Sequence, residues 1–155
     1  MKVRNNPTEE AVREMILNIL KPNRVFEGIQ PYGVYKVQRS YDGTKLFTDV
    51  PSSYFGYKGG RKFTEMAIHC KSKNIDVRID CKHQKKRDSG FVIKDLIYIS
   101  NNPENSFIFV LDGEGFKCPK VLLEITDTIK RLKLKNRVQI MQIEEFEKYL
   151  YKNVA

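Results

Sequence analysis

Apolar and polar residues follow one another along this chain in patterns that predict helices in some places and strands in others. Near the start, apolar residues recur at the spacing of one helical face. This spacing predicts a helix over residues 8 to 20, with a buried stripe formed by Val12, Met15, Ile16, Ile19 and Leu20. The preceding Asn6-Pro7-Thr8-Glu9 is typical of a helix start, and Pro22 ends the pattern.

A β-hairpin is predicted in the middle of the chain. Residues 63 to 70 and 75 to 82 have the pattern of strands, and Ser72-Lys73-Asn74 between them indicates a turn. The second strand alternates strictly between apolar and polar positions, with Ile75, Val77, Ile79 and Cys81 on one face and Asp76, Arg78, Asp80 and Lys82 on the other. This period of two predicts one apolar face and one polar face.

Residues 24 to 62 have a different composition, with glycines and prolines spread among tyrosines. Turns and short strands fit this composition best, and Val34 to Gln38 is one strand-like run. The segment is long for simple connections. We therefore expect either a small β insertion or a functional surface loop.

The rest of the chain alternates helices and strands. Helices are predicted over residues 90 to 99, 121 to 134 and 144 to 151, with strands over 106 to 111 and 138 to 143, and a turn at 112 to 115. This order predicts an α/β fold with a mixed central β-sheet flanked by helices, in which the later strands are parallel crossovers. We expect one domain over residues 1 to 155.

The charge of the chain predicts a polyanionic partner. Its 155 residues hold 28 Lys and Arg against 19 Asp and Glu, a formal net charge of +9. Basic residues recur along the whole chain, with dense patches at Lys82 to Arg87 and at Lys130 to Arg137. Nucleic acid is the partner that such a balance favours, through neutralisation of phosphates.

Other features predict a cytoplasmic, intracellular protein without a membrane partner. No apolar run approaches the roughly 20 residues of a membrane span, and the first residues lack the apolar stretch of a signal peptide. Cys70, Cys81 and Cys118 lie far apart and form no C-x-x-C pair, so we interpret them as reduced thiols.

The predicted hairpin brings candidate catalytic residues together. Closing the turn places Glu65 opposite or diagonal to Asp80, about 5 to 8 Å away between Cβ atoms. Lys82 projects from the same face as Asp80, and Gln84 continues that row if the strand persists. Two carboxylates and an ammonium group then share one site.

This combination suits phosphodiester hydrolysis with a divalent cation. Mg²⁺ prefers oxygen ligands and takes one or two protein carboxylates, so Glu65, Asp80 and a backbone carbonyl such as that of Cys81 would suffice. Lys82 would position or deprotonate the attacking water, or stabilise the negative charge that develops on the phosphate.

These residues resemble the signature of the PD-(D/E)XK nuclease superfamily in its variant with a trailing glutamine. Glu65 is followed after 14 intervening residues by Asp80-Cys81-Lys82-His83-Gln84. The first acid of the family motif is usually Asp, often after Pro, and Thr64-Glu65 stands here instead. Many members also carry a metal-site glutamate on the first helix, a role that Glu9 matches, with Glu10 as the alternative.

The resemblance implies a restriction-endonuclease-like fold and a nuclease activity. The implied reaction is Mg²⁺-dependent DNA cleavage that leaves a 5′-phosphate, with Mn²⁺ as a substitute, commonly by a homodimer. Such enzymes often carry target-recognition insertions between the first helix and the hairpin, which would suit Arg24, Lys36, Gln38, Arg39, Lys45, Tyr54 and Tyr57. Lys85, Lys86 and Arg87 would grip the DNA backbone, or form an exposed turn.

Three functions remain open at this stage. A sequence-specific restriction or homing enzyme would use the long segment to read bases, whereas a structure-specific nuclease such as a Holliday junction resolvase would read shape. In a non-catalytic nucleic-acid-binding domain, the acids would be salt-bridged to lysines. His69 and His83 are interpreted as surface or structural residues.

Overall fold

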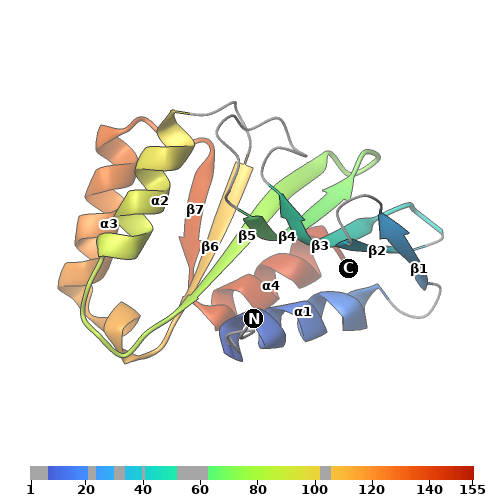
Figure 1. Ribbon diagram of the computed structural model, residues 1–155, viewed down its shortest axis with the longest axis horizontal. Coiled ribbons are helices and arrows are strands. Elements are labelled where there is room, and N and C mark those ends of the chain that lie inside the picture. The colour runs from blue at the N-terminus through green and yellow to red at the C-terminus, as the bar shows by residue number, and fades with distance from the viewer. Residues whose placement is uncertain (1–6, 21–23, 30–33, 40, 52–62, 102–105) are drawn as a thin grey trace.

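The fold is a mixed α/β arrangement in which seven strands of the described residues form one sheet with helices on both faces (Figure 1). The structure, a computed structural model, describes residues 7–20, 24–29, 34–39, 41–51, 63–101 and 106–155. Of these, residues 24–29, 34–36, 49–51 and 63–65 are described by their backbone only. The predicted class of fold, a mixed central sheet flanked by helices, is confirmed.

The sheet follows chain order, so every strand lies beside its neighbours in sequence. Strands β1 to β5 are antiparallel to one another, whereas β5, β6 and β7 are parallel, as predicted for the later strands. The elements are α1 (Pro7–Ile19), β1 (Arg24–Ile29), β2 (Val34–Arg39), β3 (Lys45–Pro51), β4 (Phe63–Cys70), β5 (Ile75–His83), α2 (Gly90–Ser100), β6 (Ser106–Asp112), the short 3₁₀ helix η2 (Glu114–Lys117), α3 (Pro119–Arg131), β7 (Val138–Met141) and α4 (Ile143–Asn153).

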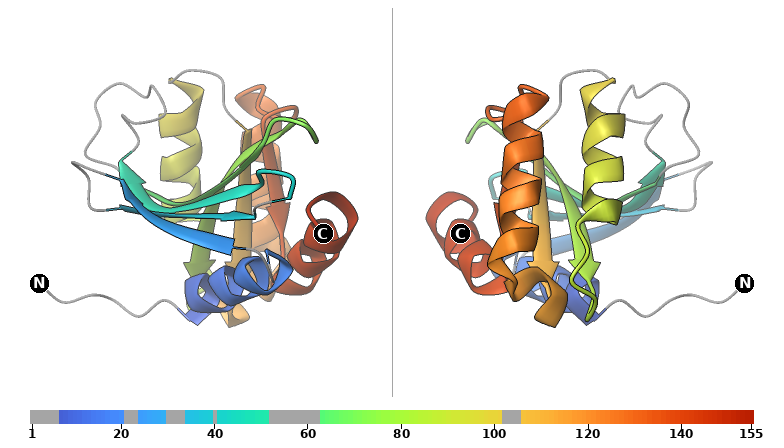
Figure 2. Two further views of the ribbon diagram at one scale, coloured as in Figure 1. Left: turned by 90° about the vertical axis from the view of Figure 1, so that its right-hand side faces the viewer. Right: turned by 90° about the vertical axis from the view of Figure 1, so that its left-hand side faces the viewer.

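Two helix pairs cover the two faces of the sheet. Helices α1 and α4 lie on one face, and α2 and α3 lie on the other (Figure 2). Ile79 and Cys81 of β5 pack in the core on the α1/α4 side, whereas Phe107 and Phe109 of β6 pack with α2 and α3. The alternation of side chains along each strand therefore divides the apolar residues between two cores.

Local sequence signals place most element boundaries within a few residues. The strand over residues 63 to 70 is as predicted, and the turn before β5 closes at Asn74, whose φ of 55° an asparagine tolerates. Helix α3 begins at Pro119, because proline suits the first helical position. It ends earlier than predicted, and Lys133 just beyond it has a φ of 58°.

The described part of residues 24 to 62 extends the main sheet. Strands β1, β2 and β3 form an antiparallel series that pairs with β4. Val37 and Leu46 are buried in the same core as α1. The short strands expected in this segment are therefore present in its described part, and they continue the main sheet. Tyr54 and Tyr57 lie outside the described residues.

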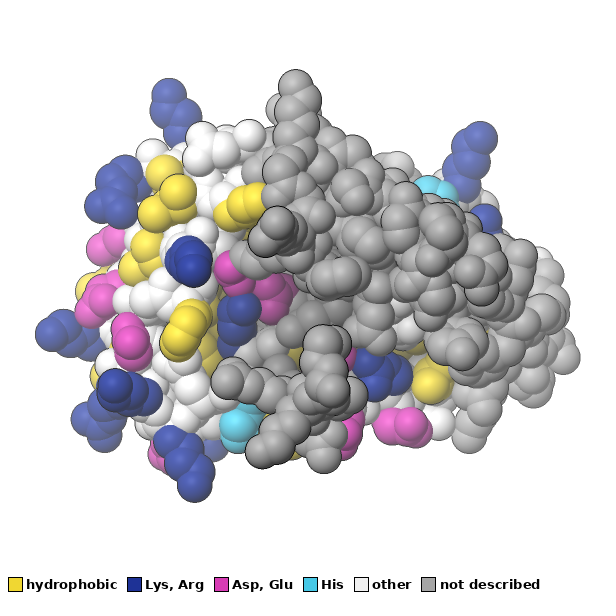
Figure 3. Space-filling model, viewed as in Figure 1, with side chains coloured by type: hydrophobic (Ala, Val, Ile, Leu, Met, Phe, Trp, Pro, Cys, Tyr) yellow, Lys and Arg dark blue, Asp and Glu magenta, His cyan; other side chains and the backbone are white. Residues whose placement is uncertain are grey.

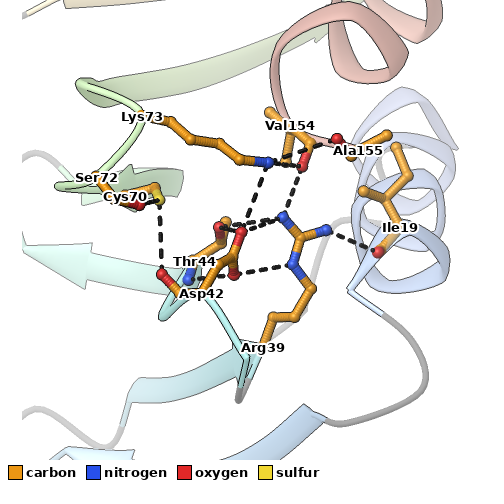
Figure 4. A network of polar contacts seen from close by, with 9 residues as sticks. All are labelled: Ile19, Arg39, Asp42, Thr44, Cys70, Ser72, Lys73, Val154 and Ala155. Atoms are coloured by element: carbon orange, nitrogen blue, oxygen red, sulfur yellow. Dashed lines mark hydrogen bonds and ion pairs between the residues drawn. The ribbon is translucent and has the colours of Figure 1, made fainter.

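A buried arginine connects the β2–β3 turn to the end of α1 and to the residues that follow α4 (Figure 4). Arg39 is 1% exposed, and its Nε and Nη2 donate to the carboxylate of Asp42 at 2.9 and 2.5 Å. Its Nη2 also donates to the Val154 carbonyl at 2.7 Å, and its Nη1 to the Ile19 carbonyl at 3.2 Å. The prediction that Arg39 contacts DNA is wrong, because its donors are buried and used within the fold.

Asp42 is held in its charged form by this network. The hydrogen bonds from Arg39 keep the pKa of the Asp42 carboxyl well below its ordinary range, although burial acts in the opposite direction. The backbone N–H and the hydroxyl of Thr44 add donors at 3.0 and 2.9 Å. The carboxylate is therefore paired and hydrogen-bonded, as a buried charge requires.

We expect Arg39→Met to lower the free energy of unfolding by about 3 kcal/mol, because the largely buried Asp42 carboxylate loses its two shortest charged hydrogen bonds and keeps only Lys73, 3.5 Å away, as a cation beside it. Urea denaturation measures this loss. Arg13→Met is the matched control, since Arg13 pairs with Glu9 at the surface of α1 and such pairs contribute about 0.5 kcal/mol. Equal losses in both variants would contradict the structural role of Arg39.

The stabilisation by Asp42 should depend on pH. Because its pKa is depressed in the folded state, the unfolded chain takes up the proton first, below about pH 4. The stabilisation is then complete above about pH 4 and is lost as the pH falls further. The difference in unfolding free energy between the natural chain and Asp42→Asn should therefore narrow progressively as the pH falls from about 4 to about 2. A constant difference in urea titrations would contradict this.

Candidate active site

Asp80 and Lys82 project from β5 toward the face of the sheet that α2 covers. Their neighbours Ile79 and Cys81 fill the core under α1 and α4, so the alternation of the strand places Asp80 and Lys82 on the opposite face. The Lys82 Nζ lies 3.3 Å from the Asp80 Oδ1. The two side chains are 24% and 19% exposed, so the pair is reachable but largely shielded from water.

The backbone register supports the predicted position of Glu65. Met66 pairs with Ile79, so continuing the antiparallel register by one residue brings Glu65 opposite Asp80. Met66 is in the core under α1, and strand alternation assigns position 65 to the other face, which Asp80 shares. The side chain of Glu65 lies outside the described residues. The backbone thus places these two acidic positions side by side.

Asp95 of α2 joins the pair and was missed by sequence reasoning. Its carboxylate Oδ2 lies 2.7 Å from the Lys82 Nζ, so the ammonium stands between Asp80 and Asp95. Asp95 is 6% exposed and shares the buried face of α2 with Val92 and Leu96. The sequence did contain a signal for this. Asp95 comes three residues after Val92 and directly before Leu96, a spacing that puts it on the same helical face as these apolar residues.

One carboxylate oxygen of Asp80 is buried without a hydrogen bond from the described residues. This oxygen is Oδ1, whose polar contact in the described part of the chain is the ion pair with Lys82. Buried carboxylate oxygens normally have hydrogen-bond donors. Among the described side chains, no group of three His, Cys, Asp or Glu residues is placed to hold a metal ion. Any metal site here therefore needs Glu65 or main-chain oxygens.

The structure does not extend the row of catalytic residues to Gln84. Strand β5 ends at His83, and the Gln84 Nε2 donates to the carbonyls of Lys86 and Asp88 at 2.9 and 2.5 Å. The amide therefore stabilises the turn after β5 and is not aligned with Lys82 by the strand. Lys85, Lys86 and Arg87 are exposed on this turn, which fits both of the interpretations given for them.

Glu9 is also separated from the Asp80–Lys82 pair. It lies on α1, which covers the opposite face of the sheet, and it accepts a hydrogen bond from Arg13 at 2.8 Å (Figure 1). No contact between described residues joins Glu9 to Asp80 or Lys82. Glu10, the alternative, is exposed on the same helix.

Thr8 anchors the start of α1 at the ends of β5 and β6. Its hydroxyl donates to the Asp112 carboxylate at 3.3 Å and lies 3.1 Å from the His83 Nδ1. Thr8 is completely buried, whereas His83 and Asp112 are each about one-third exposed. These contacts fit the interpretation of His83 as a structural residue.

The remaining predicted residues have different surroundings. The Cys81 side chain is buried in the α1/α4 core, which leaves only its main chain for the predicted metal contact. Gln38 is partly exposed on the same sheet face as Asp80, because Val37 and Arg39 beside it point to the other face. The side chain of Lys36 lies outside the described residues.

Comparison with models of known protein families, with curated proteins and with solved structures finds no match. No helix in the described ranges is long and apolar enough to cross a membrane. The assignment of a function therefore depends on the side chains and backbone positions around Asp80 and Lys82.

Two glycines let the β6–η2 loop approach the turn that follows β5. A Cβ at Gly115 would lie 1.9 Å from the Lys86 carbonyl oxygen, and one at Gly113 would lie 2.4 Å from the Gln84 carbonyl oxygen. The Gly115 N–H donates to the Gln84 carbonyl at 3.1 Å. Because these glycines have no side chain, the two backbone segments can lie in direct contact, and this contact holds the turn that leads to α2.

We expect Gly115→Ala to destabilise the fold by about 3 kcal/mol, because backbone must move to admit the methyl group. Gly90→Ala is the control, since its Cβ would meet only the Asp88 side chain, and it should change stability by about 0.5 kcal/mol or less. Thermal or urea denaturation of both variants measures the difference. Similar stabilities would contradict the close packing of this loop.

Proposed function

We propose that this chain is a metal-dependent endonuclease that hydrolyses phosphodiester bonds in DNA. The observation that carries the proposal is the grouping of Asp80, Lys82 and the backbone position of Glu65 on one face of the sheet. The desolvated Asp80 Oδ1 supports it further, because a carboxylate oxygen that accepts no hydrogen bond from described residues is suited to a hard cation.

The residues present fit Mg²⁺ as the cofactor, with Mn²⁺ as a substitute. Asp80 and Glu65 would supply carboxylate oxygens, and the Cys81 carbonyl a main-chain oxygen. Bound Mg²⁺ supplies a Lewis acid that polarises the phosphate and makes a bound water a better nucleophile. This donor set consists of oxygens alone, which is what Mg²⁺ and Mn²⁺ prefer.

Lys82 provides the fixed positive charge of the proposed site. In hydrolysis, a water oxygen bonds to phosphorus, the bond from phosphorus to the 3′ oxygen breaks, and a proton passes to that leaving oxygen. Negative charge builds up on the phosphate during this exchange, and an ammonium already oriented toward the site stabilises it. The Lys82 ammonium also has the donors to orient the attacking water.

Basic residues beside the site would hold the DNA backbone. Lys85, Lys86 and Arg87 are exposed on the turn that directly follows β5, close in sequence to Lys82. On the face that Figure 3 shows, over α2 and α3, Lys and Arg side chains are interspersed with acidic and apolar ones. We infer that the backbone contact is made at this turn, where three adjacent cations neutralise phosphates.

A second candidate function is a non-catalytic nucleic-acid-binding domain. The contacts of Lys82 with Asp80 and Asp95 favour this second function, because ion pairs with a purely structural role would have the same geometry. Such a domain would bind DNA equally with and without divalent cations.

We expect the protein to cleave DNA with Mg²⁺ or Mn²⁺ and to be inactive in excess chelator. Asp80→Asn and Lys82→Ala should each slow cleavage by on the order of 10²- to 10³-fold, while DNA affinity changes little. Asp76→Asn is the matched control, because Asp76 lies on the same strand and face but is exposed, and it should cleave normally.

Supercoiled plasmid, linear duplex, four-way junction and RNA should be assayed in parallel with DNA binding by fluorescence anisotropy. Discrete fragments from duplex indicate sequence reading, and junction-only cleavage indicates a resolvase. Full activity of Asp80→Asn would remove the proposed site. DNA binding without cleavage, and without any metal effect on thermal stability, would establish the binding domain instead.

A further inference from the structure

We propose that Asp95 is a positioning residue that fixes the Lys82 ammonium at the candidate active site. The inference rests on the proposed function for its catalytic meaning. The juxtaposition of the two side chains across α2 and β5 is its structural basis.

Asp95 makes the closer of the two contacts to Lys82. The Nζ lies 2.7 Å from the Asp95 Oδ2 and 3.3 Å from the Asp80 Oδ1, so Asp95 is the nearer of the two carboxylates that pair with it. The Lys82 side chain would otherwise be free to sample many rotamers, which is unfavourable for a group that must act at one point. Asp95 therefore determines where the ammonium stands.

The burial of Asp95 supports a specific role. A carboxylate is out of place on a helical face that otherwise buries Val92, Leu96 and Ile99, because an ion loses hydration there. An apolar residue of similar size often stabilises such a position as well as a buried ion pair does. Packing alone does not explain a carboxylate at this position, whereas the pairing with Lys82 does.

Asp80 and Asp95 have different tasks in this arrangement. Asp80 lies on the same strand as Lys82 and is the carboxylate proposed to bind the cation, so its negative charge would be shared with that ion. Asp95 comes from another element and remains available to Lys82. Since like charges repel, a lysine beside a divalent cation needs such a counter-charge to stay in place.

The frame that carries Asp95 is itself well anchored. Helix α2 begins at Gly90, whose N–H donates to the Asp88 Oδ1 at 2.8 Å. The buried Ser89 hydroxyl donates to the Glu124 Oε2 at 2.7 Å and so ties the start of α2 to α3. A site residue on a helix held in this way is positioned more accurately than one on a loop.

The test compares Asp95→Asn, Asp95→Glu and the control Ser89→Ala in steady-state DNA cleavage. Asp95→Asn should lower kcat on the order of 10- to 100-fold with little change in KM, because the ammonium is displaced while DNA contacts remain. Asp95→Glu restores the charge and should recover part of kcat. Ser89→Ala should lower stability and reduce kcat far less than Asp95→Asn does, because it leaves the Lys82–Asp95 pair itself intact.

A second readout needs neither metal nor DNA. Lysines are labelled with an amine-reactive acylating reagent, and the rate at Lys82 is compared with those at exposed Lys85 and Lys86 by mass spectrometry. Release from Asp95 should make Lys82 more accessible, so its labelling in Asp95→Asn should rise several-fold while the other two stay constant. Lys82→Arg supplies the baseline in which position 82 is not labelled.

The outcomes separate the inference from the proposed function. If the natural protein cleaves no DNA with either metal ion, the proposed nuclease function is refuted. The labelling rates alone then decide whether Asp95 holds Lys82 in place. Unchanged Lys82 labelling in Asp95→Asn overturns the inference. A loss of kcat in Ser89→Ala equal to that in Asp95→Asn also overturns it, because displacement of the whole helix would then explain both.

Discussion

Strand β5 has α1 packed against one face, and on its other face Lys82 contacts Asp95 of α2; the rest of the structure depends on this division. Its odd-numbered side chains from Ile75 to Cys81 are apolar and lie in the core under α1 and α4. Its even-numbered side chains are charged and face the side where α2 packs. A slip of one residue in register would bury Asp80 and Lys82 in the apolar core and move Ile79 and Cys81 to the face where Lys82 now meets Asp95, so the pairing with β4 and β6 is strongly specified.

The charged cluster of Asp80, Lys82 and Asp95 on that face is poorly explained by a contribution to folding stability alone. Lys82, Asp80 and Asp95 are all shielded from water, and the desolvation of such ions offsets much of their mutual attraction. The buried Arg39–Asp42 pair differs, because several further hydrogen bonds satisfy its remaining donors and acceptors. The buried Asp80 Oδ1 and Asp95 Oδ2, by contrast, accept no hydrogen bond from the described residues beyond their ion-pair contacts with Lys82.

Sequence patterns predicted the features that depend on near neighbours. The β4–β5 hairpin, the helices and the shared face of Asp80 and Lys82 follow from alternation over a few residues and from turn residues. Contacts between distant segments were not predictable in this way. Nothing local marks Arg39 as buried, since its partners include Asp42 nearby but also Val154. Asp95 likewise acquires its meaning only when α2 packs over β5.

The bond between Arg39 and the Val154 carbonyl spans 115 residues of sequence. Contacts of such long range form late, since the intervening chain must be ordered first. During synthesis, the early strands would leave the ribosome before the segment that completes their polar network exists. Final closure of this fold is therefore expected after translation has passed the last helix, and the waiting strands would be open to chaperones until then.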